Sequence, residues 1–333
     1  MILVALSRYF LGVTQTQGYK SKLFQEDLPR VLKKGTCRGS LKSWSEKMSS
    51  SFRQSVILGS EGAMGRWLGK VLAKNAIPFT GVDIKSGTNT FVADVLNAEN
   101  DLHRLLEGAD LIILAVPEDV AIKCVAQLSP HINSFALLVD CCSTKRDYVE
   151  AVSVTCVQQV LSLNPLFGPG VETSDRTLVT TTIKPGALTK KLVEILSGEV
   201  ASVIELGASQ HDEYMAMFQA GAHALILAFV TSIPDVRSAL FPLPTAVLAR
   251  LAARLLSLPA HVYWEIQAAN PFAREARKKL IQTLVDLDSV VACKDRAAFD
   301  ALFANGNRKL GSEAAPFAAD CLELFATFNR GRQ

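Results

Sequence analysis

The sequence lacks three features that would point to particular classes of protein. Its seven cysteines form no C-x-x-C pair and have no metal-ligand spacing, so we expect no metal site and a reducing, cytoplasmic compartment. Its longest apolar run, residues 220–233, is short for a membrane span and contains a histidine, which favours a buried helix and no membrane. Of the net charge of +3, residues 1–53 contribute +7, so the remainder has no basic surplus and nucleic acid is not an expected partner.

What is present is the composition of a globular protein. Of the 333 residues, 49% are apolar and 20% are charged, and the length suffices for two domains. We interpret residues 1–53 as a weakly ordered basic extension, because they are polar and have no clear periodicity. A true start at Met48 and a transit peptide are the alternatives for this segment.

From residue 54 onward, short apolar runs alternate with helical patterns. Strand candidates lie at residues 55–59, 79–84, 110–117, 135–142, 157–163, 177–183 and 202–206. Strands that alternate with helices predict an α/β fold, here a Rossmann-type, doubly wound parallel sheet over residues 54–207. After Gly207 the strand signals stop, and residues 208–333 are predicted to form an all-helical C-terminal domain.

A glycine-rich stretch, "GSEGAMG" at residues 59–65, lies between the first strand and the first helix. The dinucleotide fingerprint G-x-G-x-x-G would need glycine at position 60, where this chain has Ser60. Gly62 and Gly65 take the places that bring the backbone close to the pyrophosphate and pack the helix on the strand. A strand–turn–helix corner with chance glycines is the alternative.

An acidic residue at the end of the next strand supports the dinucleotide reading. Asp83 follows Gly62 by 21 residues, where a carboxylate accepts hydrogen bonds from the adenosine ribose and repels a 2′-phosphate. This favours NAD over NADP, although Asp83 could instead be a turn residue. The predicted cofactor-binding residues are Gly59, Ser60, Gly62, Ala63, Met64, Gly65, Asp83, Val116 and Pro117.

Four further motifs follow the glycine-rich loop. They are "AVP" at 115–117, "DCCSTK" at 140–145, "LNPLFGPG" at 163–170 and "HDEYMAMFQAGAH" at 211–223. In this order they resemble the prephenate/arogenate dehydrogenase family, over most of residues 54–333. The resemblance is to the branch that includes enzymes fused to chorismate mutase, a domain that 53 residues cannot hold.

The resemblance implies roles for several residues. The family pattern D-x-x-S-V-K places Ser143 in the catalytic group, and Lys145 becomes a cofactor or substrate contact, or else a surface lysine. The pattern H-P-M-F-G-P places Asn164 at the family's catalytic histidine. Gln219 and His223 share a helix face that would meet the substrate's pyruvyl side chain, although a core histidine is the alternative, and His211 is interpreted as structural.

The family's substrate-binding arginine aligns with Arg254, and Arg250 one turn earlier is the fallback. A planar guanidinium suits the two carboxylates of the family's cyclohexadiene substrate. A solvated charge on a helix face is the alternative for either arginine. The resemblance also implies that the helical domain pairs two subunits, so that we expect a homodimer and a small-molecule dicarboxylate as partners.

Asn164 makes the expected reaction unusual. The family's reaction is an oxidative decarboxylation, in which hydride leaves ring C4 for NAD while a histidine takes the proton of the 4-hydroxyl. An amide has no accessible basic site, and loss of a general base costs roughly 10²–10⁴-fold in rate. The protein is then a slow prephenate or arogenate dehydrogenase, a non-catalytic ligand-binding homologue, or an enzyme whose substrate needs no base.

The third hypothesis is the most attractive chemically. The lone pair of a neutral C4 amine can expel hydride directly and form an iminium, and decarboxylation then gives an aniline. Asn164 would accept an N–H bond while Ser143 holds its amide. The substrate would be 4-amino-4-deoxyprephenate and the product 4-aminophenylpyruvate, as in a known offshoot of the family that serves aminophenylalanine-containing natural products.

Overall fold

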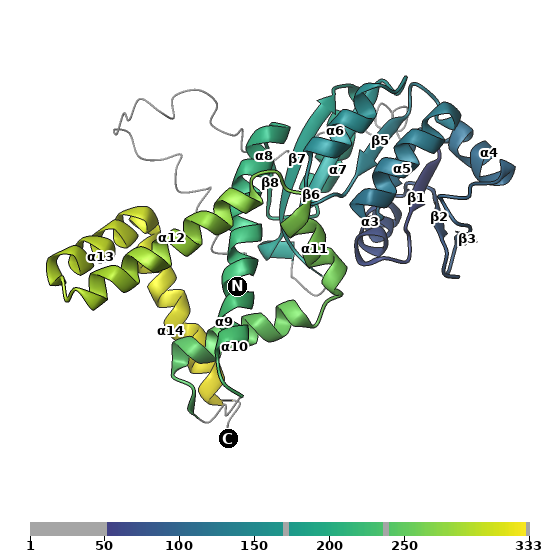
Figure 1. The fold of residues 1–333 in the computed structure, drawn as a ribbon. Helices are drawn as coiled ribbons and strands as arrows, with labels where there is room; N and C mark the ends of the chain where they lie inside the picture. The colour runs from purple at the N-terminus through teal and green to yellow at the C-terminus, as the bar shows by residue number, and fades with distance from the viewer. Residues whose placement is uncertain (1–51, 169–172, 236–239, 331–333) are drawn as a thin grey trace, which may run out of the picture. The chain divides into compact units, whose positions relative to one another are not determined.

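The computed structural model describes residues 52–168, 173–235 and 240–330 (Figure 1). The predicted extension therefore lies outside the described residues except for its last two positions, and of these Phe52 is buried in the core. The described residues form two compact units that divide between Asp212 and Glu213, and each unit is considered by itself. The predicted domain boundary, between Gly207 and Ala208, lies a few residues earlier, at the start of helix α8 (Ala208–Met215), within which the two units divide. The boundary stays a prediction.

The first unit is built around one eight-stranded sheet with the strand order β3-β2-β1-β4-β5-β6-β7-β8. The strands are β1 (Ser55–Leu58), β2 (Phe79–Asp83), β3 (Thr90–Val92), β4 (Leu111–Leu114), β5 (Leu137–Asp140), β6 (Gln159–Pro165), β7 (Thr177–Lys184) and β8 (Ser202–Glu205). Strands β1, β4 and β5 are buried along their whole length, because helices cover both faces of the sheet.

Helices connect the strands and cover the two faces of the sheet. They are α3 (Ala63–Lys74), α4 (Asn100–Gly108), α5 (Glu118–Leu128), α6 (Arg146–Ser153) and α7 (Ala187–Ser197), with short 3₁₀ turns η2 (Ser129–His131) and η3 (Thr173–Asp175). Val56 and Leu58 of β1 pack in one core with α4, α5 and α6, whereas Ile57 packs in the other with α3 and α7. Successive side chains of a strand point to opposite faces, so one apolar strand serves both cores.

The prediction of a Rossmann-type fold is confirmed, with two differences in the sheet. Strand β7 runs antiparallel to β6, and β8 runs parallel to β7, so the two strands at this edge of the sheet run in the direction opposite to the other strands. The short strand β3 was not predicted, because Phe91 and Val92 are exposed and leave little apolar pattern to read. The remaining neighbouring strands pair in parallel.

The second unit is helical throughout its described length. After α8 (Ala208–Met215), in which the two units divide, its elements are the π-helix η4 (Ala216–Gly221), α9 (Ala222–Ser232), α10 (Leu243–Leu256), α11 (Ala260–Ala268), α12 (Ala273–Ala292), α13 (Arg296–Leu310), the 3₁₀ turn η6 (Gly311–Glu313) and α14 (Ala314–Arg330). This agrees with the all-helical prediction for the C-terminal region.

One helical segment is longer than the sequence pattern indicated. Helices α8, η4 and α9 continue into one another over Ala208–Ser232, 25 residues that are long and apolar enough to cross a membrane by length and composition. The helix extends beyond the apolar run at 220–233 from which we expected no membrane span, and that expectation stays a prediction. Leu225 and Leu227 of this segment are exposed, so the predicted burial of α9 is not seen in the single chain.

Candidate active site

The glycine-rich loop connects β1 to α3 at the point where the strand order reverses. Strands β2 and β4 flank β1 on opposite sides, which is where open α/β sheets bind nucleotides. Gly59 has φ +84°, and a Cβ there would lie 2.3 Å from the carbonyl oxygen of Ala115 in the loop after β4. Any other residue would clash with that loop, so the glycine is required by the close approach of the two loops.

The third glycine has the packing role predicted for it. A Cβ on Gly65 would lie 2.1 Å from the carbonyl oxygen of Gly59, so only glycine allows α3 to start so close to the strand. Gly62 is the N-cap of α3 and no side chain caps the helix. The backbone N–H groups at the start of α3, including those of Ala63 and Met64, suit the pyrophosphate of a dinucleotide. The loop present therefore fits an NAD-type cofactor.

The acidic residue Asp83 lies beside this loop and has a structural role of its own. Its Oδ2 accepts the backbone N–H of Glu61 (2.9 Å), and its Oδ1 accepts that of Lys85 (3.0 Å). Each carboxylate oxygen has a second lone pair, so ribose hydroxyls could still donate to Asp83. Arg66, the cation next to the predicted ribose site, forms an ion pair with Glu61 (3.1 Å). The carboxylate of Asp83 and this pairing of Arg66 both suit NAD better than a cofactor with a 2′-phosphate.

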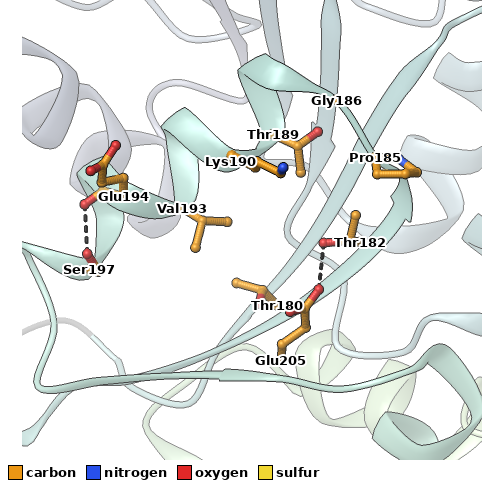
Figure 2. Close-up of a pocket in the computed structure, with 10 residues that line it drawn as sticks. All are labelled: Thr180, Thr182, Pro185, Gly186, Thr189, Lys190, Val193, Glu194, Ser197 and Glu205. Atoms are coloured by element: carbon orange, nitrogen blue, oxygen red, sulfur yellow. Dashed lines mark hydrogen bonds between the residues drawn. The ribbon is translucent and has the colours of Figure 1, made fainter. Parts of the chain in front are cut away.

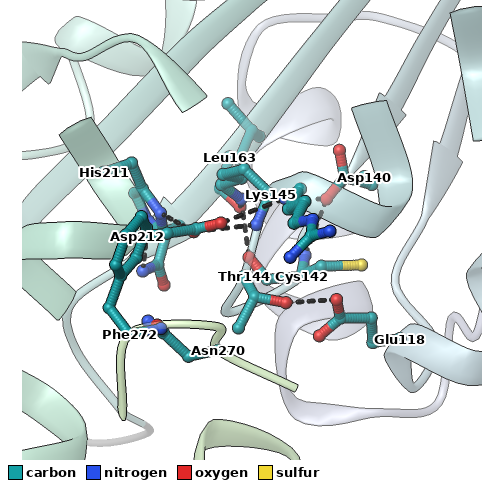
Figure 3. Close-up of polar contacts among 12 residues, drawn as sticks. Glu118, Asp140, Cys142, Thr144, Lys145, Leu163, His211, Asp212, Asn270 and Phe272 are labelled. Carbon is teal, nitrogen blue, oxygen red and sulfur yellow. Dashed lines mark hydrogen bonds and ion pairs between the residues drawn. The ribbon is translucent and has the colours of Figure 1, made fainter. Parts of the chain in front are cut away.

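The loop after β5 carries the predicted residues Ser143 and Lys145, and here the structure rules out one of the two interpretations of the lysine. Lys145 is fully buried, and its Nζ donates to the carbonyl oxygens of Cys142 (2.6 Å) and Leu163 (2.9 Å) and lies 3.8 Å from Asp140 (Figure 3). An ammonium group has three donors. Lys145 therefore ties the β5 loop to β6 and is not the surface lysine of the alternative, whereas contact with a substrate or cofactor stays a prediction.

A buried carboxyl group next to this loop was missed by the sequence reasoning. Glu118 follows Val116 and Pro117 at the start of α5, and its Oε1 accepts a hydrogen bond from the hydroxyl of Thr144 (Figure 3). Burial raises the pKa of Glu118 to about 7, although the bond from Thr144 and the charge of Lys145 both lower it. The signal was an acidic residue directly after the "AVP" motif.

Asn164 lies near the end of β6 and is 2% exposed. Its Nδ2 lies 2.9 Å from Nε2 of His211, and Nδ1 of that ring lies 2.8 Å from Oδ1 of Asp212. We expected Ser143 to hold the Asn164 amide, whereas the structure places His211 against it, because the start of α8 brings that ring to the amide. The full burial of His211 agrees with the structural role that we expected for it.

Asp212 is in turn fixed by the main chain of α6. Its Oδ1 accepts the backbone N–H of Lys145 (2.9 Å) and its Oδ2 accepts that of Arg146 (3.1 Å) (Figure 3). These N–H groups belong to the start of α6, where a helix favours negative charge. A connected set of hydrogen bonds thus runs from the N-terminus of α6 through Asp212 and His211 to Asn164, a set termed the Asn164 relay below.

The predicted substrate-binding residues of the second unit come from three of its helices. Gln219 lies in the π-helix η4, a form of helix that often marks functional sites, and His223 follows in α9. Gln219 Oε1 and His223 Nδ1 are buried and have no hydrogen-bond partner within the described part of the chain. Buried polar atoms normally have a hydrogen-bond partner, so each of these two atoms needs one from outside the described residues.

An aromatic residue connects His223 with the predicted arginine. The ring of Tyr263 meets that of His223 edge to face at 5.0 Å. Burial raises the pKa of Tyr263, and the charge of Arg254 opposes that rise. Arg254 itself is exposed and donates to Ser257 Oγ (3.3 Å), and the fallback Arg250 donates to the carbonyl of Ala246. The second unit thus places Arg254, Tyr263 and His223 near one another.

A cavity of about 360 Å³ lies elsewhere in the first unit, between α7 and the strands β7 and β8 (Figure 2). Thr189 and Lys190 of α7 line it opposite Thr182 and Glu205, which are hydrogen-bonded to each other at 2.9 Å. Because β7 runs against the parallel strands, its carboxyl end lies at the other edge of the sheet from the glycine-rich loop. None of the predicted site residues lines this cavity.

Comparison with known proteins identifies the family of this chain. The family model for the nucleotide-binding domain of prephenate dehydrogenase matches residues 68–190. A 4-amino-4-deoxyprephenate dehydrogenase from Streptomyces pristinaespiralis is 32% identical over 293 residues, which cover 84% of this chain and 99% of that protein. A probable arogenate/prephenate dehydrogenase from Methanocaldococcus jannaschii is 25% identical over 274 residues, 78% of this chain and 61% of that protein.

Solved structures show the same fold. A crystal structure of prephenate dehydrogenase from A. aeolicus, in complex with hydroxyphenyl propionate and NAD+, has a TM-score of 0.63 at 17% identity and covers 79% of this chain and 99% of its own. Synechocystis arogenate dehydrogenase has a TM-score of 0.61 at 15% identity, with 77% and 99% covered. With the extended match to the Streptomyces protein, these findings show that the chain belongs to the prephenate dehydrogenase family and is an NAD-dependent dehydrogenase of the prephenate type.

Proposed function

We propose that this protein catalyses the NAD-dependent oxidative decarboxylation of 4-amino-4-deoxyprephenate to 4-aminophenylpyruvate, with release of CO₂ and NADH. The observation that carries the proposal is the chemistry of the Asn164 relay. Asn164 holds the position of the family's catalytic histidine, and an amide does not take a proton at neutral pH. The name of the Streptomyces relative, a 4-amino-4-deoxyprephenate dehydrogenase, supports the same substrate.

The amine makes a base at this position unnecessary. NAD, when bound, supplies the acceptor for the hydride that leaves C4. The nitrogen lone pair forms the C4=N bond as the hydride departs, and loss of CO₂ returns an electron pair to the ring, which becomes an aniline. A neutral amine releases no proton in this sequence. Asn164 then has one role, to accept an N–H hydrogen bond and hold the amine in place.

An uncharged ring at His211 also suits the substrate's charge. Burial lowers the pKa of His211 to about 4, so that the ring is uncharged at neutral pH. The site therefore presents no imidazolium to the amine, which binds a proton readily in water. In the second unit, we infer that His223 and Arg254 bind the carboxylates of the substrate, with Gln219 and Tyr263 beside them.

The exposed apolar side chains of the second unit support a homodimer, which we propose as the working form. They include Leu225 and Leu227 on α9 and Ile281, Leu284 and Val285 on α12. Large exposed apolar side chains on several helices of one unit are typical of a surface that another subunit covers. Light scattering on the purified protein tests this, and a monomeric mass at micromolar concentration would contradict it.

The decisive assay compares two substrates that differ only at C4. Purified protein with NAD receives either 4-amino-4-deoxyprephenate or prephenate, and NADH formation is followed by absorbance. We expect fast turnover of the amine and turnover of prephenate that is slower by roughly 10²–10⁴-fold, the usual contribution of the missing base. Equal or faster turnover of prephenate would favour a prephenate dehydrogenase, and silence with both substrates in a protein that binds NAD would favour a non-catalytic homologue.

A further inference from the structure

The side chain of Asn164 can in principle be turned in two ways. Its oxygen accepts hydrogen bonds and its NH₂ group donates them, and the two groups have nearly the same shape. If the oxygen faces the substrate, the site recognises a donor such as an amine. If the nitrogen faces the substrate, the site recognises an acceptor, so the orientation of this amide decides what the protein can bind.

The partner that fixes the amide is His211, and the protonation of His211 follows from Asp212. The Asp212 carboxylate accepts the backbone N–H groups of Lys145 and Arg146, and a carboxylate can only accept. Nδ1 of His211 lies 2.8 Å from Oδ1 of Asp212, so Nδ1 carries a proton and donates it. The tautomer of a histidine is commonly set in this way by the partner of its other nitrogen.

The second nitrogen of His211 is then left without a proton. His211 is fully buried, and burial lowers the pKa of its ring to about 4, helped by the charge of Lys145 and opposed by Asp212. A neutral ring with its proton on Nδ1 has a lone pair on Nε2. The neighbour at 2.9 Å is the Asn164 side chain, which must therefore direct an N–H group at His211.

We propose that His211 and Asp212 are positioning residues, which hold the Asn164 amide with its nitrogen toward His211 and its oxygen toward the C4 substituent of the substrate. This inference rests on the proposed function, because it makes Asn164 an acceptor for an amine N–H. The amide N–H also occupies the one lone pair of the His211 ring. His211 therefore cannot act through Asn164 as a replacement base.

The tautomer of His211 tests the inference without any substrate. The full-length protein is labelled with ¹⁵N-histidine, and long-range ¹H–¹⁵N correlation spectra show which ring nitrogen is protonated. His211→Gln identifies the signal of His211 by its disappearance. We expect a neutral ring with the proton on Nδ1 at pH 7. A proton on Nε2, or on both nitrogens, would overturn the inference, because Asn164 would then have to turn its oxygen toward His211.

The isosteric variant Asn164→Asp gives an independent result. It places a carboxylate at each nitrogen of the His211 ring, so we expect the ring to be doubly protonated at pH 7. Asn133→Asp is the matched control, since Asn133 is exposed and lies before β5, at the opposite edge of the sheet. A ring that stays neutral in a folded Asn164→Asp variant whose new carboxyl group is ionised by its ¹³C shift would show that position 164 does not contact His211.

Kinetics separate this inference from the proposed function. Removing the bond in His211→Leu should lower kcat/KM for the amine roughly tenfold, since one hydrogen bond no longer orients the amide. His211→Gln, which can still bond to the amide, should recover part of the loss, and equal losses in the two variants would overturn the positioning role. If prephenate proves to be the better substrate while the tautomer is as expected, the proposed function fails and the orientation of Asn164 stands.

Discussion

Replacing Asn164 by histidine should restore the base that the family uses. The new ring can donate an N–H to Nε2 of His211, as the amide of Asn164 does now at 2.9 Å. Its other nitrogen would then offer a lone pair to the 4-hydroxyl of prephenate. A general base contributes roughly 10²–10⁴-fold. Position 164 is only 2% exposed, and the larger ring costs about 1–3 kcal/mol in packing. We therefore expect the low end, about a hundredfold gain in prephenate turnover.

The assay is NADH formation from prephenate by Asn164→His, compared with the parent protein and with Asn164→Gln, which supplies no base. The gain in turnover should appear as the pH rises, because the new imidazole must lose its proton before it can act as a base. Burial lowers the pKa of this imidazole, so the step should lie below the ordinary pKa of histidine. Turnover by the parent should show no such step. A folded Asn164→His protein that binds NAD but gains no prephenate turnover would refute the placement of Asn164 at the reacting C4 substituent.

Three further changes have outcomes that follow from the geometry. Lys145→Met removes a buried cation beside Asp140 and two hydrogen bonds to carbonyl oxygens, which should lower the free energy of unfolding by about 3–5 kcal/mol in chemical denaturation. Glu118 has a pKa of about 7 in the folded protein, above the ordinary value of 4.5, so the folded state binds this proton more tightly than the unfolded state does. The free energy of unfolding should therefore fall by on the order of 3 kcal/mol between pH 5 and 8, and Glu118→Gln should abolish that fall. Arg254→Ala should raise the KM of the substrate roughly tenfold or more in steady-state kinetics, because a carboxylate would lose a charged donor.

Each of these changes has a matched control in the chain. Lys70→Met alters an exposed lysine of α3 and should change stability by less than about 0.5 kcal/mol. Glu150→Gln on the exposed side of α6 should leave the pH dependence of stability as it is in the parent. If Lys145→Met behaves like Lys70→Met, or Glu118→Gln like Glu150→Gln, the buried network is not formed as described. If Arg250→Ala and not Arg254→Ala raises the KM, the alignment is wrong by one helical turn.

The sequence by itself determined the class of fold and the place of the cofactor loop. Short apolar runs separated by helical patterns can only be buried as a sheet covered on both faces, and this pattern is local. Gly59 and Gly65 were likewise readable, because close backbone approach excludes every other side chain. The motif around Asn164 predicted, through its resemblance to the family pattern, that an amide stands where the family has its base.

Only the tertiary structure decided which side chains meet Asn164. His211 lies 47 positions further along the chain, and the bond between them depends on where α8 starts relative to β6. The same folding buries Lys145, which in the sequence resembles a surface lysine or a ligand contact, between the β5 loop and β6. Periodicity describes which face of an element is apolar, whereas a polar contact depends on distances between elements, which no local pattern contains.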